Sequence, residues 1–215
     1  MSRTDQYLLG VGSFMTNNKD KIMEAAMSLF HNLGFQATGV EEILSSSGVC
    51  KSNFYYHFKS KEELGVKVIE RMVQHMRRKL LEPSLDNEEL APARRVERLF
   101  EQMLDFCEEH DLRKGCFFGN LSLELSGRFE ELRKPLSGFF SELEDKLTRT
   151  LDEGLRRGEL TLSGLGPAEL ALPLVSLLQG GVLLAKTHRD SKALRDSIRL
   201  LQVWIGEERG VSYGR

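Results

Sequence analysis

The chain has 215 residues, of which 40% are apolar and 29% charged, a composition that excludes disordered, collagenous and membrane proteins. Its formal net charge is −2, so any binding to a polyanion must come from local clustering of basic residues. Three cysteines, Cys50, Cys107 and Cys116, cannot close a disulfide framework and favour a reducing cytosol. The first residues lack the apolar core of a signal peptide, so we expect a cytoplasmic globular protein.

Helical periodicity runs through most of the chain. Apolar residues recur three and four positions apart from Ile22 to Leu33, and Gly34 supplies a stop. No strand alternation is evident, so we predict an all-α fold of about nine helices. Its parts are a flexible tail (1–17), a helix-turn-helix domain (18–65) and a helical sensing and dimerisation domain (66–215). The predicted helices span residues 19–33, 38–47, 50–58, 60–81, 92–110, 116–125, 128–157, 167–186 and 192–207, with Pro135 expected to kink the seventh or to mark its true start.

Residues 38–58 have the form of a helix-turn-helix. Thr38 and Glu41 have the spacing of a capping box that opens a short helix, and Gly48 ends that helix because glycine adopts a left-handed backbone at little cost. In the next helix Phe54 and Phe58 lie four residues apart and are expected to be buried. The opposite face then presents Ser52, Asn53, Tyr56 and His57.

A basic surface accompanies this motif. No acidic residue occurs from Ile43 to Lys61, whereas Lys51 and Lys59 fall within that stretch. A nucleic-acid phosphate backbone would meet no repulsion there. The alternative is an ordinary solvated helix face, but the complete motif favours DNA binding.

The stretches Gly34–Ile43 and Gly48–Leu64 resemble the DNA-binding domain of TetR-family transcriptional regulators. This resemblance implies a homodimer with a C-terminal ligand-binding domain, acting on operator DNA in response to a small-molecule effector. It implies that Thr38 and Lys61 hold phosphates at two helix N-termini. It also implies an operator-facing set of Asn53, Tyr55, Tyr56 and His57, beside which Lys51 and Ser52 are further DNA-binding candidates.

Three positions depart from the family pattern. Cys50 stands where the family has a serine cap, and a thiol caps a helix poorly. Leu44 replaces the usual alanine and demands more room between the short helices. Glu41 and Glu42 would repel phosphate if they faced the DNA groove, although Glu41 has its expected capping role. Tyr55 could pack on the first helix as readily as contact DNA.

The C-terminal part resembles, at Gly115–Asn120 with Glu124 and at Gln179–Lys186, the branch that includes the repressor of N-ethylmaleimide reductase, a regulator of electrophile and oxidant defence. Cys116 follows Arg113 and Lys114 at a predicted helix start, where both the cations and the helix dipole favour a thiolate. We therefore predict Cys116 as a sensor, with Lys186 as a candidate partner.

Other interpretations of these residues remain open. Cys116 could be a small buried apolar residue, as most free cysteines are, and Cys107 is expected to lie in the core. Cys107, His110 and Cys116 offer only three metal ligands. No P-loop, Rossmann, H-E-x-x-H or G-x-S-x-G motif is present, so no cofactor is predicted and an enzyme is disfavoured. The rivals are an activator of the same family and a helical thiol-dependent enzyme.

The stretch Leu170–Ala185 is apolar nearly all round. It is shorter than the roughly 20 residues needed to span a bilayer, so we interpret it as a buried helix. One of its faces must find cover beyond a single bundle, which favours a homodimer built from the last two long helices.

Overall fold

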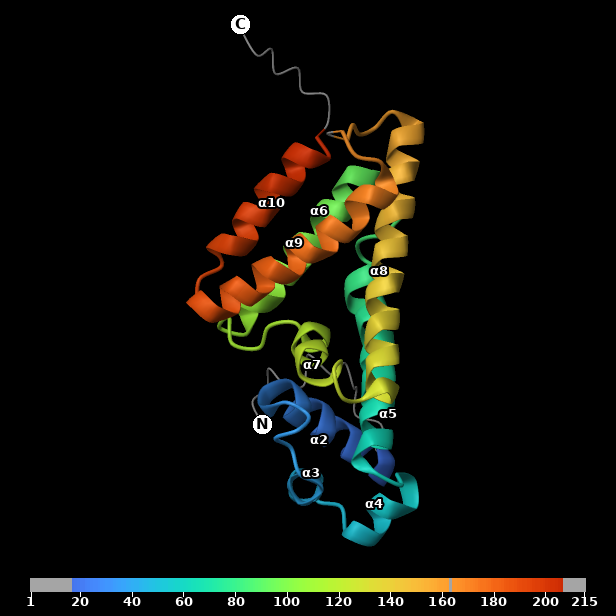
Figure 1. Ribbon diagram of the computed structural model, residues 1–215, viewed down its shortest axis with the longest axis vertical. Helices are drawn as coiled ribbons and strands as arrows, with labels where there is room; N and C mark the ends of the chain where they lie inside the picture. The colour runs from blue at the N-terminus through green and yellow to red at the C-terminus, as the bar shows by residue number, and fades with distance from the viewer. Residues whose placement is uncertain (1–16, 163, 207–215) are drawn as a thin grey trace, which may run out of the picture. The chain divides into compact units, whose positions relative to one another are not determined.

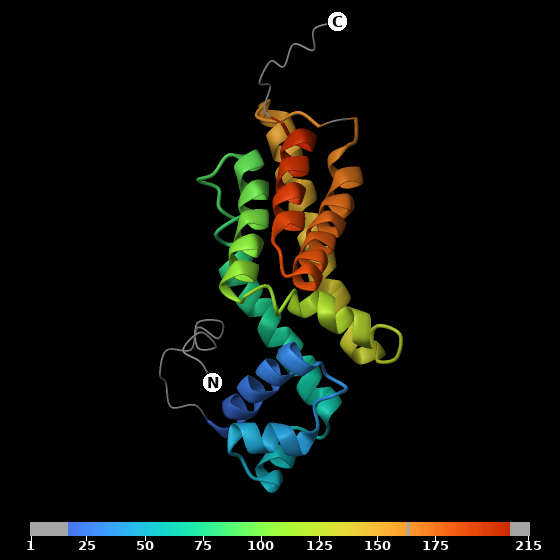
Figure 2. The same ribbon diagram turned by 90° about the vertical axis from the view of Figure 1, so that its left-hand side faces the viewer.

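The computed structural model describes residues 17–162 and 164–206 and divides into two compact units (Figures 1 and 2). The first contains residues up to His75 together with Phe117–Ser137, and the second contains Met76–Cys116 and the chain from Gly138 onward. The described residues form nine α-helices and one π-helical segment, with no strand, so the predicted all-α class is confirmed. The predicted tail at 1–17 lies, except for Asn17, outside the described residues.

The first unit contains the N-terminal helices α2 (Asn18–Leu33), α3 (Val40–Ser47) and α4 (Lys51–His57), which lie beside α5 (Lys61–Met76) (Figure 2). The Asn17 side chain caps α2 by accepting from the Asp20 N–H at 2.9 Å. Gly48, with φ +67°, ends α3 as predicted. Ser60 Oγ accepts from the Glu63 N–H at the start of α5, and the Glu63 carboxylate reaches back to the Lys59 N–H. The unit also contains α7 (Phe117–Leu125) and the beginning of α8 (Glu130–Arg157).

Aromatic rings fill the core of the first unit. Phe35, which is 1% exposed, follows α2 and lies 5.0 Å from the Phe30 ring and 5.8 Å from the Phe129 ring, centroid to centroid. Gly65 of α5 is buried against Phe35 and against Leu132 of α8. The segment between α2 and α3 therefore packs against several helices. This packing is stabilising, because burying a phenylalanine removes a large apolar area from water.

The second unit consists of η1 (Arg77–Leu81), α6 (Pro92–Glu109), most of α8, α9 (Pro167–His188) and α10 (Lys192–Trp204). In it α9 and α10 pack against each other and against α6. One buried charge is well compensated: the Arg95 side chain, 3% exposed, lies 2.9 Å from the Glu153 carboxylate and also donates to the Leu90 carbonyl. Pairing of this kind is what a buried guanidinium requires.

Several predicted boundaries need correction. The helix that begins at Lys61 widens into a π-helical turn at Arg77–Leu81, where the Glu82 N–H bonds to the Arg77 carbonyl. Pro135 lies inside α8, which begins earlier at Glu130, so it does not mark the helix start. The last helix ends at Trp204 rather than at residue 207, and α9 extends to His188.

The longer α9 could cross a membrane by length and composition alone, which the predicted stretch could not. However, eight of its residues are buried, and it packs on α6 and α10. That packing is typical of a core helix. The predicted division into domains near residue 65 stays a prediction.

Gly65 should be sensitive to enlargement. A Cβ there would lie 2.8 Å from the Phe35 ring and 2.9 Å from Leu132 Cδ2, so Gly65→Ala should lower the free energy of unfolding by about 1–3 kcal/mol through overpacking. Gly138→Ala in α8 is the matched control, because its Cβ meets no atom within 4 Å and should stabilise the helix by up to about 1 kcal/mol. Denaturant unfolding of both variants checks this, and equal stabilisation by both would contradict the packing.

Candidate nucleic-acid interface

Helix α4 has one buried and one exposed face, as the sequence predicts. Phe54 and Phe58 are fully buried, with ring centroids 5.9 Å apart. Tyr56 is 82% exposed, the largest exposure among the large hydrophobic side chains described. Tyr55 is half exposed and sets its ring edge against Phe54 at 5.2 Å, so it both packs and remains accessible.

The remaining polar residues of α4 lie beside these rings. Ser52 is exposed, and the ring of half-buried His57 lies edge-on to Tyr56 at 4.8 Å. Asn53 is half buried, and its Oδ1 is shielded from solvent with no hydrogen-bond partner among the described residues. This helix thus carries hydrogen-bonding and aromatic groups, which are suited to contacting base edges.

Lys51 at the start of α4 is held by a neighbouring carboxylate. Its Nζ lies 2.7 Å from Glu41 Oε1 of α3, and both side chains are largely exposed. The hydrogen bond and the charge of Glu41 raise the pKa of Lys51. Glu41 therefore does not close a capping box, and the predicted box is wrong: α3 is capped at Gly39 without a side-chain bond.

Thr38 and Lys61 are engaged within the protein. Thr38 is fully buried, and its hydroxyl donates to the Gly34 carbonyl at 2.7 Å. The Lys61 ammonium donates to the carbonyls of Phe35 and Thr38, both at 3.0 Å, and lies 4.4 Å from the centroid of the Phe35 ring. Both side chains hold residues 34–38, which we call the α2–α3 turn. The phosphate contacts that the resemblance implies for them would have to compete with these bonds.

Cys50 occupies the N-cap of α4 and makes no side-chain cap bond, which confirms the weak cap predicted for a thiol. The side chain is exposed, with Sγ 3.3 Å from Ser52 Oγ. This hydrogen bond, with a smaller contribution from the Asn53 backbone, lowers the pKa of the Cys50 thiol. Cys50 is the most accessible of the three thiols, because Cys107 and Cys116 are buried.

The predicted sensor segment lies in the second unit. Cys116 directly precedes α7, as predicted, but is only 5% exposed, and Cys107 is buried in α6. The pKa of Cys107 is raised to about 12, mainly by burial and to a smaller extent by the nearby Cys116 and Glu108. Lys186 is half buried in α9. In the part of the chain that the structure describes, no group of three acidic, histidine or cysteine residues could hold a metal ion.

The loop that leads to Cys116 has an unusual backbone. Asp111 and Leu112 have φ values of +52° and +55°, and Gly115 has +69°. A bulky residue such as leucine seldom adopts this left-handed conformation, which costs roughly 1–2 kcal/mol. The Leu112 carbonyl accepts from Arg189 at 2.7 Å.

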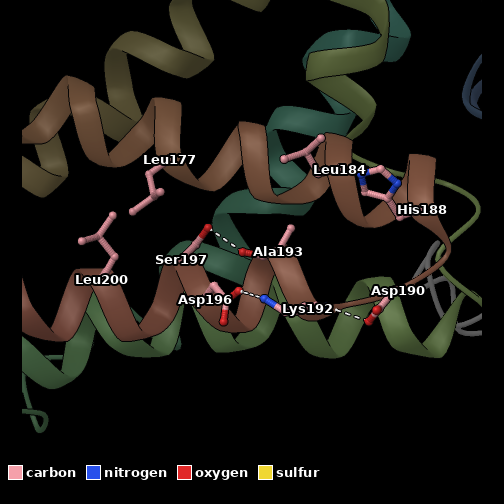
Figure 3. Close-up of a pocket in the computed structure, with 9 residues that line it drawn as sticks. All are labelled: Leu177, Leu184, His188, Asp190, Lys192, Ala193, Asp196, Ser197 and Leu200. Atoms are coloured by element: carbon pink, nitrogen blue, oxygen red, sulfur yellow. Dashed lines mark hydrogen bonds and ion pairs between the residues drawn. The ribbon is translucent and has the colours of Figure 1, made fainter.

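A shallow groove of about 430 Å³ runs between α9 and α10 (Figure 3). Leucines from both helices line part of it, and charged residues of the turn between the helices and of the first turns of α10 line the rest. Exposed leucines and a valine continue this apolar character along both helices. The groove itself is lined by the apolar Leu177, Leu184 and Leu200 and by the charged Asp190, Lys192 and Asp196.

Comparison with known proteins decides the family. Residues 22–66 match the family described as bacterial regulatory proteins, tetR family, and residues 92–201 match the tetracyclin repressor-like C-terminal domain. The chain belongs to the TetR family. A TetR-family chain of this kind is a DNA-binding transcriptional regulator and not an enzyme, which excludes the thiol-dependent enzyme as a rival.

The TetR-family relatives align over most of their length. An uncharacterised HTH-type regulator of Lactococcus lactis is 31% identical over 87% of this chain and 93% of its own. The HTH-type transcriptional repressor NemR of Escherichia coli is 28% identical over 85% and 90%. The crystal structure of the reduced form of NemR superposes with a TM-score of 0.83 at 27% identity, covering 90% of this chain and 100% of NemR.

Removing the partner of Lys51 should tighten operator binding. An exposed ion pair is weak, so Glu41→Gln should improve operator affinity by about fivefold at most, with a steeper salt dependence as Lys51 becomes available to phosphate. Glu42→Gln, which makes the same charge change at an exposed neighbouring position, is the control. Fluorescence anisotropy across a salt series measures both, and equal effects would show that the Glu41–Lys51 pair plays no special part.

Proposed function

We propose that this chain is a repressor whose dimer binds a pseudo-palindromic operator through α4 of each protomer and is released by an electrophile or an oxidant. The observation that carries the DNA-binding part is the exposed face of α4, rich in aromatic and hydrogen-bonding groups and flanked by lysines in a stretch without acidic residues. An activator would use the same interface and differ only in where its operator lies.

The residues that contact DNA fall into two groups, one suited to the phosphate backbone and one to the base edges. Exposed Lys51, Ser52 and Lys59 are suited to phosphate, which fixes register without carrying sequence information. Thr38 and Lys61 contribute by holding the turn before α3. The base edges are read by the aromatic and amide side chains Asn53, Tyr55, Tyr56 and His57, with the half-buried Asn53 needing to turn outward.

The dimer would form over the face of α9 and α10. Leu172, Leu183 and Leu184 of α9 and Leu200 and Val203 of α10 are between 39% and 69% exposed. An apolar stripe of this kind on a helix pair is typical of an interface. Two-fold symmetry of such a dimer matches the symmetry of a pseudo-palindromic operator, with half-sites about 34–36 Å apart or somewhat more.

The effector proposal centres on Cys116. The Cys116 thiolate would form a bond to one carbon of a maleimide double bond while water protonates the other carbon. A peroxide would convert the thiolate to a sulfenic acid with release of hydroxide. Burial of Cys116 requires the preceding loop to open first, and the left-handed Asp111 and Leu112 make that loop costly to hold closed. The relative NemR, crystallised in a reduced form, supports a redox signal. A DNA-binding regulator whose three cysteines form no disulfide belongs in the cytoplasm.

The experiment has two steps. Selection from a random DNA pool should first yield a pseudo-palindromic operator, and N-ethylmaleimide or dilute peroxide should then release it from the wild type. In a Cys50→Ser background, Cys116→Ser should retain the operator under the same treatment, whereas Cys107→Ser should release it, because the raised pKa of Cys107 keeps that thiol protonated at neutral pH.

Cys50→Ser is the necessary control. Cys50 is exposed at the cap of α4, so its alkylation would block DNA directly, and the Cys116 effect should be measured in a Cys50→Ser background. Release from Cys50→Ser/Cys116→Ser as readily as from Cys50→Ser alone would refute Cys116 as the sensor. A noncovalent ligand among the C-terminal helices would then be the better account.

A further inference from the structure

Glu124 of α7 binds the backbone of the α2–α3 turn through hydrogen bonds. Its carboxylate accepts from the Phe35 N–H at 2.9 Å and from the Gln36 N–H at 2.5 Å. The Gln36 side chain returns a bond to the Glu124 carbonyl at 3.3 Å. Hydrogen bonds to a charged acceptor are about twice as strong as neutral ones, so this single side chain fixes two consecutive peptide groups.

Gly34 leaves room for the Glu124 carboxylate beside the turn. A Cβ at residue 34 would lie 2.9 Å from Glu124 Oε2, and the backbone there has φ +91°. Both the close approach and the left-handed conformation require glycine. The glycine that ends α2 is therefore also the place where the carboxylate of α7 enters the turn.

The face of α7 that carries Glu124 is anchored at its other end as well. Phe117, Leu121 and Glu124 follow i, i+4, i+7 spacing and so share one helix face. Phe117 and Leu121 are buried, and the Phe117 ring lies edge-on to His31 of α2 at 5.6 Å. The first residue of α7 and its last turn both bind the N-terminal helices, so α7 moves with them as one body.

The chain passes between the two compact units at three places. Two of these, at residues 75–76 and 137–138, lie within continuous helical segments. The third is the peptide bond from Cys116 to Phe117, which follows a non-helical loop containing left-handed Asp111, Leu112 and Gly115. A change in that loop therefore acts directly on the first residue of α7.

We propose that Glu124 is the positioning residue that transmits the regulatory signal: it couples the loop at residues 110–116, through α7, to the α2–α3 turn and hence to α3 and α4. This inference rests on the proposed function and names the route of its regulation. Such coupling requires that the loop has two states, and that both the effector and the operator shift the equilibrium between them. By reciprocity, operator binding must then alter the loop as much as the loop alters operator binding.

Hydrogen exchange of the full-length protein tests the proposal without knowledge of the effector. In the free wild type, peptides that span residues 34–38 should be protected, and Glu124→Gln should speed their exchange at least tenfold, because the amide group presents a donor toward one of the two backbone N–H groups. Glu131→Gln, an exposed charge change in the same unit, should leave them unchanged. Glu124→Asp, which keeps the charge with a shorter reach, should give an intermediate rate.

The second arm adds selected operator DNA. Binding should change exchange at residues 108–116 in the wild type and in Glu131→Gln, and this change should fall at least threefold in Glu124→Gln measured at saturating operator. Persistence of the full change in Glu124→Gln, or its absence from the wild type, would overturn the proposal. If the wild type bound no DNA, the proposed function would fail. That outcome is distinguishable from a failure of this proposal, since the first arm would still measure how the Glu124 hydrogen bonds protect residues 34–38.

Discussion

The α2–α3 turn, residues 34–38, is held by two opposite charges, and the DNA-binding part of the molecule depends on it. Glu124 accepts from the N–H groups of Phe35 and Gln36, while Lys61 donates to the carbonyls of Phe35 and Thr38. The Phe35 ring is buried in the aromatic core. A short peptide with both its donors and its acceptors bound to charged side chains has little freedom left, so the start of α3 is fixed relative to α5 and α7.

This arrangement explains how a short helix can present an exposed recognition face. Helix α4 has only seven residues, too few to be stable by itself, and its thiol cap contributes no side-chain bond. Its stability must come from Phe54 and Phe58, which bury completely while Tyr56 remains in solvent. The rigid turn and the buried rings thus leave the polar face of α4 free for DNA.

Much of this was accessible from the sequence because it is local. Helical periodicity predicted the helices, and the four-residue spacing of Phe54 and Phe58 predicted the two faces of α4. The predicted Thr38–Glu41 capping box was wrong because tertiary partners competed: Thr38 bonds back to Gly34, and Glu41 pairs with Lys51 of another helix. Spacing within a helix carries no information about either partner.

The role of Glu124 was inaccessible for the same reason. The sequence marked Glu124 only through a family resemblance, since the backbone groups that it binds lie 88 and 89 residues away. The phosphate role expected for Lys61 likewise came only from the family resemblance. The observed carbonyl contacts involve peptide groups, which any residue type supplies, so no sequence pattern could reveal them.

The most direct measurement is the unfolding free energy of Lys61→Met compared with Lys59→Met. Methionine keeps the apolar stem and removes the ammonium, so Lys61→Met should lose about 1.5–3 kcal/mol with its charge-assisted bonds to the turn. Lys59 is exposed, and Lys59→Met should stay within about 0.5 kcal/mol of the wild type while reducing the salt dependence of operator binding. A Lys61→Met protein as stable as Lys59→Met, with the same reduction in salt dependence, would contradict the central claim that Lys61 holds the turn.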